Sequence, residues 1–309
     1  MSTDCTDLCL PALSGSSLLG FMAALGTFRT LSEPFDSDNL RIKWIPMGSS
    51  YAPVLRGSAL EDREAVLATL HAALSSFAGH YSITIDKDLK IARPAFRGLA
   101  NRAATDFLAS DDQLAAAMAA AFGCDAIGNE DGQIEDTAFR TMSGAGHQHF
   151  LKFMDELARE TTLDHLREAL FGPWLYRDPS PVMRWDSEDD RRYALRWDEP
   201  SKDPVRTVRG ANRLAIASLP LFPVVPVSGN SIATTGFAGR GSRDTFITWP
   251  IWTGWLNLDA VRSVLSLKEL HERTEANTPT VMARGICAIF RSQRITLGKY
   301  RNFTPAEPL

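Results

Sequence analysis

Hydrophobic positions recur with helical spacing near the start of the chain. The apolar stripe predicts a helix over residues 18–31, with Ser16 or Ser17 available as its N-cap. Gly20 and Gly26 lie inside this helix and lower its intrinsic stability. Each glycine therefore indicates a close contact with another segment.

The next segments alternate between strand-like and helical patterns. Residues 40–45 alternate apolar and polar side chains and predict a half-exposed strand, and after a turn at 46–49 residues 51–55 can return as a second strand. Residues 60–77 carry an amphipathic helical pattern, whereas the alternation over 81–85 predicts another strand. This part of the chain therefore predicts a short antiparallel sheet with helices around it.

Helical patterns continue over the following ninety residues. Residues 94–122 are alanine-rich and predict helix with one interruption, and 128–132 form a polar loop. The glycine-rich stretch 140–146 leads into a helix predicted at 147–159, and a further short helix is predicted over 162–171.

The chain changes character after Pro173, where prolines multiply and short strands replace helices. Six of the seven tryptophans lie beyond this point: Trp174, Trp185, Trp197, Trp249, Trp252 and Trp255. The sequence thus predicts an α+β fold, with a helical, acidic region at 1–172 and a β-richer, basic region at 173–309, as two regions or as one continuous domain. No alternating βαβ pattern is present, which argues against a doubly wound parallel sheet.

Composition places the chain among ordinary globular proteins. Of 309 residues, 44% are hydrophobic and 23% charged, and no run of eighteen apolar residues exists to span a membrane. The acidic N-terminus lacks the basic region of a signal peptide. Four scattered cysteines, Cys5, Cys9, Cys124 and Cys287, predict neither a disulfide framework nor a metal site, so a cytoplasmic location is expected.

Charge is distributed unevenly along the chain. The net charge is −4, yet residues 204–303 hold thirteen Lys/Arg and five Asp/Glu. Such asymmetry is typical of a basic region that meets an anionic partner, and also of two halves that neutralise each other.

Three basic segments, at 206–213, 240–243 and 284–303, carry the candidate binding residues. In the last of these, Arg and Lys alternate with Tyr and Phe, as in grooves where rings stack bases and cations follow the backbone of a single strand. The same composition also suits docking of an acidic protein. The candidate nucleic-acid or partner contacts are Arg206, Arg209, Asn212, Arg213, Arg240, Arg243, Arg291, Arg294, Lys299 and Arg301.

A mixed-charge stretch at 184–197 repeats an Arg-Trp-Asp triplet and marks the seam between the two regions. It predicts a solvated turn that covers Trp185 and Trp197, and these rings together with Tyr300 are candidates for stacking. Its carboxylates, Asp186 to Asp190, can also be read with His147 and His149 as a metal-dependent hydrolase or nuclease site. Motifs of the well-known hydrolases and kinases are missing, so no catalytic residue, metal or cofactor is assigned.

Several of these blocks resemble one family. Leu10-Pro-Ala-Leu-Ser-Gly15 with the following Leu18–Gly26 resembles the opening of a family encoded in type I-G (formerly I-U) CRISPR loci, where it stands beside the helicase-nuclease or extends it. Later blocks of the same family are similar to Trp185–Arg196, Arg209–Ala215, Leu219–Pro223 and Arg291–Thr296. The resemblance thus touches the chain from end to end.

The resemblance implies a non-enzymatic subunit or accessory protein of a type I CRISPR antiviral defence system. Its implied partners are guide RNA or target DNA, other effector subunits and the helicase-nuclease, without a membrane. Two alternatives stay open at this point: a protein-only adaptor that recruits the helicase-nuclease, and the metal-dependent hydrolase described above. The net negative charge weighs against a dedicated nucleic-acid binder.

Overall fold

A computed structural model describes residues 5–33, 39–110, 113–142, 148–189, 206–228, 231–239, 244–271, 278–297 and 300–309. Helices and small antiparallel sheets are both present, so the predicted α+β fold is confirmed. Within the described residues, no helix combines the length and the apolar character needed to cross a membrane.

The helical elements are α1 (Leu18–Ser32), α2 (Arg63–Ser75), α3 (Tyr81–Thr84), α4 (Arg93–Ser110), α5 (Leu114–Phe122), α6 (Phe150–Glu160), α7 (Leu163–Phe171), η2 (Ser187–Asp189), α8 (Arg209–Ser218), η4 (Leu219–Leu221), α9 (Leu258–Leu265), α10 (Lys268–His271) and α11 (Thr278–Met282). The strands are β1 (Thr6–Cys9), β2 (Arg41–Met47), β3 (Ser50–Gly57), β4 (Gly123–Gly128), β5 (Ile134–Asp136), β6 (Val224–Val227), β7 (Ser231–Thr234), β8 (Phe237–Ala238), β9 (Phe246–Trp252), β10 (Ile286–Leu297), β11 (Tyr300–Phe303) and β12 (Glu307–Pro308).

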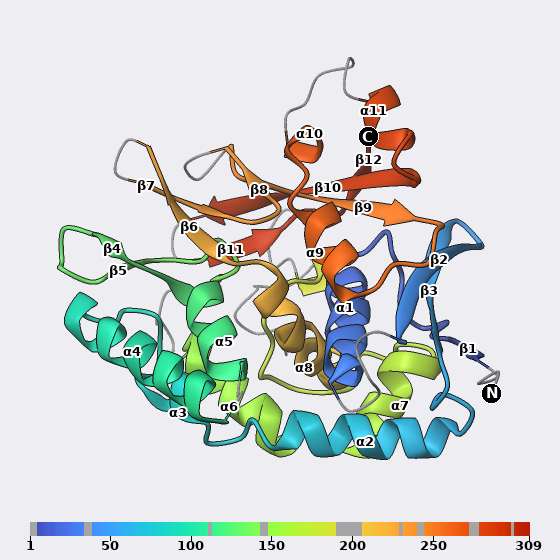
Figure 1. Ribbon diagram of the computed structural model, residues 1–309, viewed down its shortest axis with the longest axis horizontal. Helices are drawn as coiled ribbons and strands as arrows, with labels where there is room; N and C mark the ends of the chain where they lie inside the picture. The colour runs from blue at the N-terminus through green and yellow to red at the C-terminus, as the bar shows by residue number, and fades with distance from the viewer. Residues whose placement is uncertain are drawn as a thin grey trace, which may run out of the picture.

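The strands form separate antiparallel sheets around the central helices. One sheet has the order β1-β3-β2, and a larger one has the order β11-β10-β9-β8 with β12 paired to β10. Two-stranded hairpins, β4-β5 and β6-β7, lie at the other side of the molecule (Figure 1). A bridge between Ile42 and Leu256 ties the first sheet to the chain that follows β9.

Two helices from opposite regions of the sequence, α1 and α8, form the centre of the fold (Figure 1). Every residue of both helices is buried. They approach so closely that a Cβ on Gly26 would lie 1.8 Å from the carbonyl oxygen of Leu214. The contact predicted from the presence of Gly26 in a helix is therefore confirmed, and one hydrophobic core spans both sequence regions.

Aromatic rings join α1 to both sheets. The Phe21 ring stacks on Trp44 of β2, with centroids 5.6 Å apart, and tilts against Trp249 of β9 at 5.9 Å. Trp252 meets the same Phe21 edge-on at 6.5 Å. The indole N–H of Trp249 donates to the carbonyl oxygen of Gly15, which fixes the start of α1 against β9. The tryptophans of these two strands therefore serve the core.

The amphipathic patterns before residue 80 predicted the structure well. Ser17 caps α1 by accepting from the Gly20 amide, and the β2-β3 hairpin and α2 follow as expected. The strand predicted over 81–85 is wrong, because this segment is α3. His80 caps this helix, because its Nδ1 accepts from the Ser82 amide. The cap favours a helix more strongly than the five-residue apolar–polar alternation favours a strand.

The expectation that strands alone follow Pro173 is also wrong. Residues 209–218 form α8, and all its residues are buried, its two arginines included. The helix predicted at 147–159 starts later, at Phe150. The region after Pro173 is nevertheless richer in strands, as predicted.

Candidate functional site

Three segments that are far apart in the sequence meet beside β10 and β11. The indole N–H of Trp185 donates to the Phe139 carbonyl oxygen at 2.9 Å. The Thr141 hydroxyl donates to the Met183 carbonyl oxygen at 2.8 Å. From β10, Arg294 Nη2 donates to the Arg140 carbonyl oxygen at 2.7 Å. The structure thus brings the glycine-rich lead-in, the mixed-charge stretch and the C-terminal basic segment together.

The charged centre of this region is a cluster that we call the arginine junction, formed by Asp88, Asp136, Arg140, Arg294 and Arg301. Arg140 donates through Nε and Nη2 to the two carboxylate oxygens of Asp88, each at 2.9 Å, and through Nη1 to Asp136. Burial lowers the pKa of Arg140, but the charges of Asp136 and Asp88 outweigh burial and raise it. Arg140 is therefore a fully engaged structural cation.

Arg294 and Arg301 are less completely paired. The Arg294 Nε is buried without a hydrogen-bond partner, and burial together with the positive charges of Arg301 and Arg140 lowers the pKa of Arg294 to about 10. Arg301 is half-buried on β11, where it pairs with Thr296, and it hydrogen-bonds no described side chain. The junction thus holds three guanidinium groups against two carboxylates, an excess of positive charge that favours an anion.

The described part of the mixed-charge stretch, residues 184–189, packs beside this junction, and the remainder of the predicted turn lies outside the described residues. Arg184 and Asp186 are each 3% exposed. Arg184 has a left-handed backbone, with φ at +58°, and its Nη2 donates to Gln148 Oε1 at 2.6 Å. The Asp186 carboxylate accepts from the Tyr176 hydroxyl at 3.0 Å and from the Glu188 amide at 3.2 Å. A left-handed non-glycine residue held by burial is a feature found at functional sites.

Asp186 makes the stability of the fold depend on pH. Burial raises the pKa of Asp186 above its usual range despite the hydrogen bonds from Glu188 and Tyr176. The folded state therefore binds this proton more tightly than the unfolded chain does, so the contribution of Asp186 to stability improves as pH falls toward 4. We expect the wild type to gain stability relative to Asp186→Asn between pH 7 and pH 4, measured by urea denaturation. A difference that is constant with pH would contradict this assignment.

The basic segment 206–213 does not present its side chains as a surface patch, which corrects the sequence-based expectation. Arg209, Asn212 and Arg213 are 7%, 0% and 2% exposed, because α8 is buried on all sides. Arg209 pairs with Glu160. Arg206 is the exposed member and donates to the Arg177 carbonyl oxygen at 2.8 Å.

Asn212 and Arg213 bind other parts of the chain. Asn212 accepts from the Met183 amide at 2.9 Å and donates to the Thr207 hydroxyl at 2.9 Å, which ties α8 to the mixed-charge stretch. Arg213 donates to the Leu74 carbonyl oxygen of α2. The polar residues of this block are therefore internal connectors of the fold.

The stacking candidates and the remaining cations have mixed outcomes. Trp185 is fully buried, between Phe139 and Phe150, so the prediction that it stacks a base is wrong and its ring belongs to the core.

Arg291 is half-buried and donates from Nε to the Thr248 hydroxyl at 3.0 Å. Tyr300 belongs to β11, but its side chain is outside the description. The candidates that lie outside the described residues are Arg240, Arg243, Lys299, Trp197, His147 and Asp190.

The described part of the chain provides no set of ligands for the alternative metal site. Within those residues, no group of three or more His, Cys, Asp or Glu side chains is placed to hold a metal ion. His149 stands at the N-cap of α6 without a capping hydrogen bond from its side chain.

An aromatic site that the sequence did not single out lies on the outer face of the first sheet. Lys43 Nζ lies 4.3 Å and Arg56 Cζ 4.1 Å from the centroid of the half-buried Trp255 ring. Alternation predicted that Lys43 faces outward, but only the bridge between Ile42 and Leu256 brings Trp255 to it. Cation–π contacts of this kind are found where proteins stack bases.

Comparison with known proteins identifies no relative: no family model, no curated protein and no solved structure matches the chain. The functional assignment therefore depends on the residues and contacts described above and on the resemblance of the sequence blocks.

Proposed function

We propose that this chain is a non-enzymatic subunit or accessory protein of a type I CRISPR antiviral defence system, and that its arginine junction contacts the phosphate backbone of single-stranded guide RNA or displaced target DNA. The family assignment is supported by the sequence blocks from Leu10 to Thr296. The phosphate contact is supported by the excess of guanidinium groups over carboxylates at the junction.

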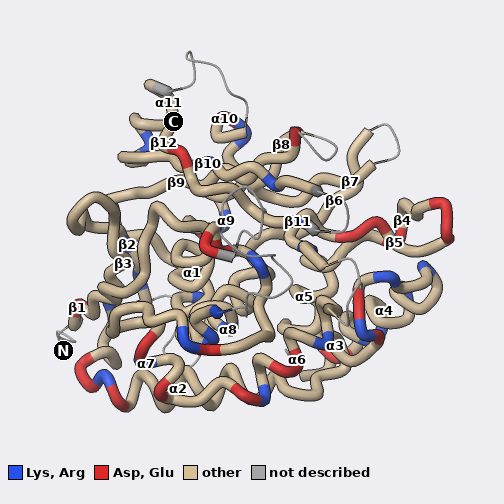
Figure 2. Tube along the Cα trace, turned by 180° about the vertical axis from the view of Figure 1, so that it is seen from behind, with Lys and Arg blue, Asp and Glu red and all other residues tan. Residues whose placement is uncertain are grey.

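The observation that carries the proposal is the arrangement of Arg294 and Arg301. Arg294 has an Nε–H that no group accepts, and the nearby Arg301 has a guanidinium free of hydrogen bonds to described residues. A phosphate bound by Arg301 offsets the repulsion between the two cations. Acidic residues gather on the neighbouring β4-β5 hairpin (Figure 2), which confines the positive potential to the junction itself.

The structure shows where two of the resemblance blocks lie in the fold. The Arg-Gly-Ala-Asn-Arg block builds α8, and Trp185 packs into the core under the mixed-charge stretch. These two blocks therefore belong to the scaffold, whereas the block Arg291–Thr296 lies in β10 and contributes Arg294 to the junction.

The proposal is tested by removing one charge from the junction. Arg301→Gln is expected to weaken binding of a single-stranded RNA about tenfold in a fluorescence anisotropy titration, because a hydrogen bond to a charged group contributes about 1.5 kcal/mol. Arg301 is half-buried and its side chain hydrogen-bonds none of the described residues, so the fold is expected to persist.

The matched control is Arg284→Gln, which removes the same charge near the opposite end of β10. Arg284 is exposed and pairs with Glu269 at 2.7 Å, so its loss changes the net charge without touching the junction. Equal affinities of the two variants would contradict a phosphate site at the junction. Co-purification with the helicase-nuclease without any RNA or DNA binding would instead support the protein-only adaptor.

A further inference from the structure

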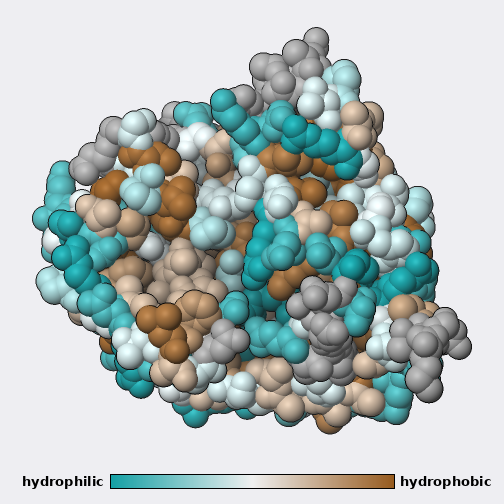
Figure 3. Space-filling model, in the orientation of Figure 1, coloured by the Kyte–Doolittle hydropathy of each residue, from teal (hydrophilic) through white to brown (hydrophobic). Residues whose placement is uncertain are grey.

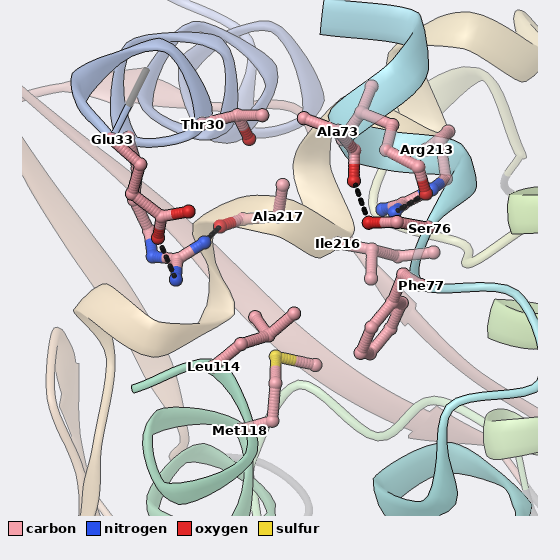
Figure 4. Close-up of a pocket in the computed structure, with 12 residues that line it drawn as sticks. Thr30, Glu33, Ala73, Ser76, Phe77, Leu114, Met118, Arg213, Ile216 and Ala217 are labelled. Atoms are coloured by element: carbon pink, nitrogen blue, oxygen red, sulfur yellow. Dashed lines mark hydrogen bonds and ion pairs between the residues drawn. The ribbon is translucent and has the colours of Figure 1, made fainter. Parts of the chain in front are cut away.

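A cavity of about 110 Å³ opens between the ends of α1 and α2 and the sides of α5 and α8 (Figure 4). The space-filling view shows a hollow near the centre of this face, with hydrophilic surface on one side and apolar surface on the other (Figure 3). Its lining includes Arg29, Glu33, Phe77, Leu114, Met118 and Arg213.

Arg213 is the most unusual group in this lining. Its side chain is buried, its Nη2 donates to the Leu74 carbonyl oxygen at 2.6 Å, and its Cζ lies 5.3 Å from the centre of the Phe77 ring. Its Nε is buried without any hydrogen-bond partner. Among the residues that the structure describes, no carboxylate forms an ion pair with Arg213. A buried guanidinium without a counter-ion is costly unless an anion completes it.

The one carboxylate of the lining is already engaged. Glu33 accepts from Arg29 Nη2 at 3.3 Å, and Arg29 also donates to the Ala217 carbonyl oxygen at 3.4 Å (Figure 4). Glu33 is largely exposed and pairs with Arg29, which leaves Arg213 without a carboxylate partner among the described residues. Burial together with the charge of Arg29 lowers the pKa of Arg213 to about 9, so Arg213 still carries its positive charge at neutral pH.

The remainder of the wall is apolar. Phe77 of the chain after α2, Leu114 and Met118 of α5, and Ile216 of α8 line the cavity around the guanidinium groups (Figure 4). A cavity of about 150 Å³ with such walls holds benzene, so this space suits a molecule of comparable or smaller size. Apolar walls around a few placed polar groups are the usual composition of a small-molecule site.

We propose that this cavity binds a small organic acid, whose carboxylate pairs with the guanidinium group of Arg213 while its short apolar part packs on Phe77, Leu114 and Met118. This site goes beyond the proposed nucleic-acid contact and does not depend on it, because the arginine junction shares no residue with the cavity.

The ligand class is tested with three probes on the full chain. Butyrate, followed by NMR chemical-shift titration, is expected to bind with a dissociation constant on the order of 1 mM, as fits a ligand of so few atoms. Butyramide has the same size without the charge, and inorganic phosphate has charge without the apolar part. Both are expected to bind at least about tenfold more weakly. Equal binding of butyramide, or tighter binding of phosphate, would overturn the assignment to organic acids.

Two variants locate the site. Arg213→Met keeps an unbranched apolar side chain but removes the guanidinium group that lies over Phe77, and it is expected to lose butyrate binding at least about tenfold. Ala73→Leu places a larger side chain in the cavity from α2 and leaves Arg213 in place; leucine is a good helix former. This variant is expected to lose butyrate binding as well.

Arg284→Met, outside the cavity, is the control and should bind butyrate as the wild type does. If Arg213→Met fails to fold, Ala73→Leu decides alone. Butyrate binding unchanged in Ala73→Leu, or lost equally in Arg284→Met, would overturn the proposal.

Discussion

Replacing Gly26 by alanine is expected to destabilise the fold by more than about 3 kcal/mol. The added Cβ would lie 1.8 Å from the carbonyl oxygen of Leu214 and 2.8 Å from its carbonyl carbon. Both atoms belong to the backbone of α8, so no side-chain rotation relieves the clash. The two central helices must separate, and the core that they share is disrupted.

Gly98→Ala is the matched control for this substitution. Gly98 lies inside α4, and a Cβ there meets nothing within 4 Å. Alanine should therefore stabilise this helix by about 0.5–1 kcal/mol, because it restricts the unfolded chain without a clash. Both free energies of unfolding come from urea denaturation followed by circular dichroism. Similar effects at the two positions would show that α1 and α8 do not pack as described.

Removing the central cation of the arginine junction is the second large effect. Arg140→Leu is expected to cost about 3–5 kcal/mol at pH 7, because Asp88 and Asp136 are then left buried without their partner. Arg97→Leu is the surface comparison: Arg97 pairs with Asp125 at 2.7 Å, yet its side chain is 63% exposed. Its loss should cost less than about 1 kcal/mol.

The Arg140→Leu variant should also show a distinctive pH profile. Burial already raises the pKa of Asp136 while Arg140 is present, and loss of the cation raises it further. Protonation then neutralises Asp136, so the deficit in unfolding free energy should shrink as pH falls from 7 toward 4. A deficit that stays constant over this range would mean that lost packing, not unpaired charge, destabilises the variant.

Sequence patterns predicted the amphipathic elements and failed where burial is complete. The helix from Leu18 and the hairpin around Gly48 follow from capping, periodicity and turn chemistry. The helix α8 was missed because its arginines suggest exposure, whereas Arg213 and Arg209 bond to Leu74 and Glu160 inside the protein. Charged side chains predict a surface only when no internal partner is available.

The candidate site was predictable in its parts but not in its assembly. Arg294 and Arg301 stand out in sequence as cations interleaved with aromatic residues. Their meeting with Arg140 depends on β10 and β11 lying against a segment about 150 residues earlier, as the bond from Arg294 to the Arg140 carbonyl oxygen shows. No local pattern encodes such a contact, because it is set by how the sheets pack on the central helices.

The salt dependence of single-stranded RNA binding tests the central claim, a phosphate contact at the arginine junction, most directly. The slope of log affinity against log salt concentration is measured for the wild type and for Arg301→Gln. If Arg301 neutralises one phosphate, its removal lowers the magnitude of the slope by about 0.7, while Arg284→Gln leaves the slope unchanged. A wild-type slope near zero, or an Arg301→Gln slope equal to that of the wild type, would contradict the claim.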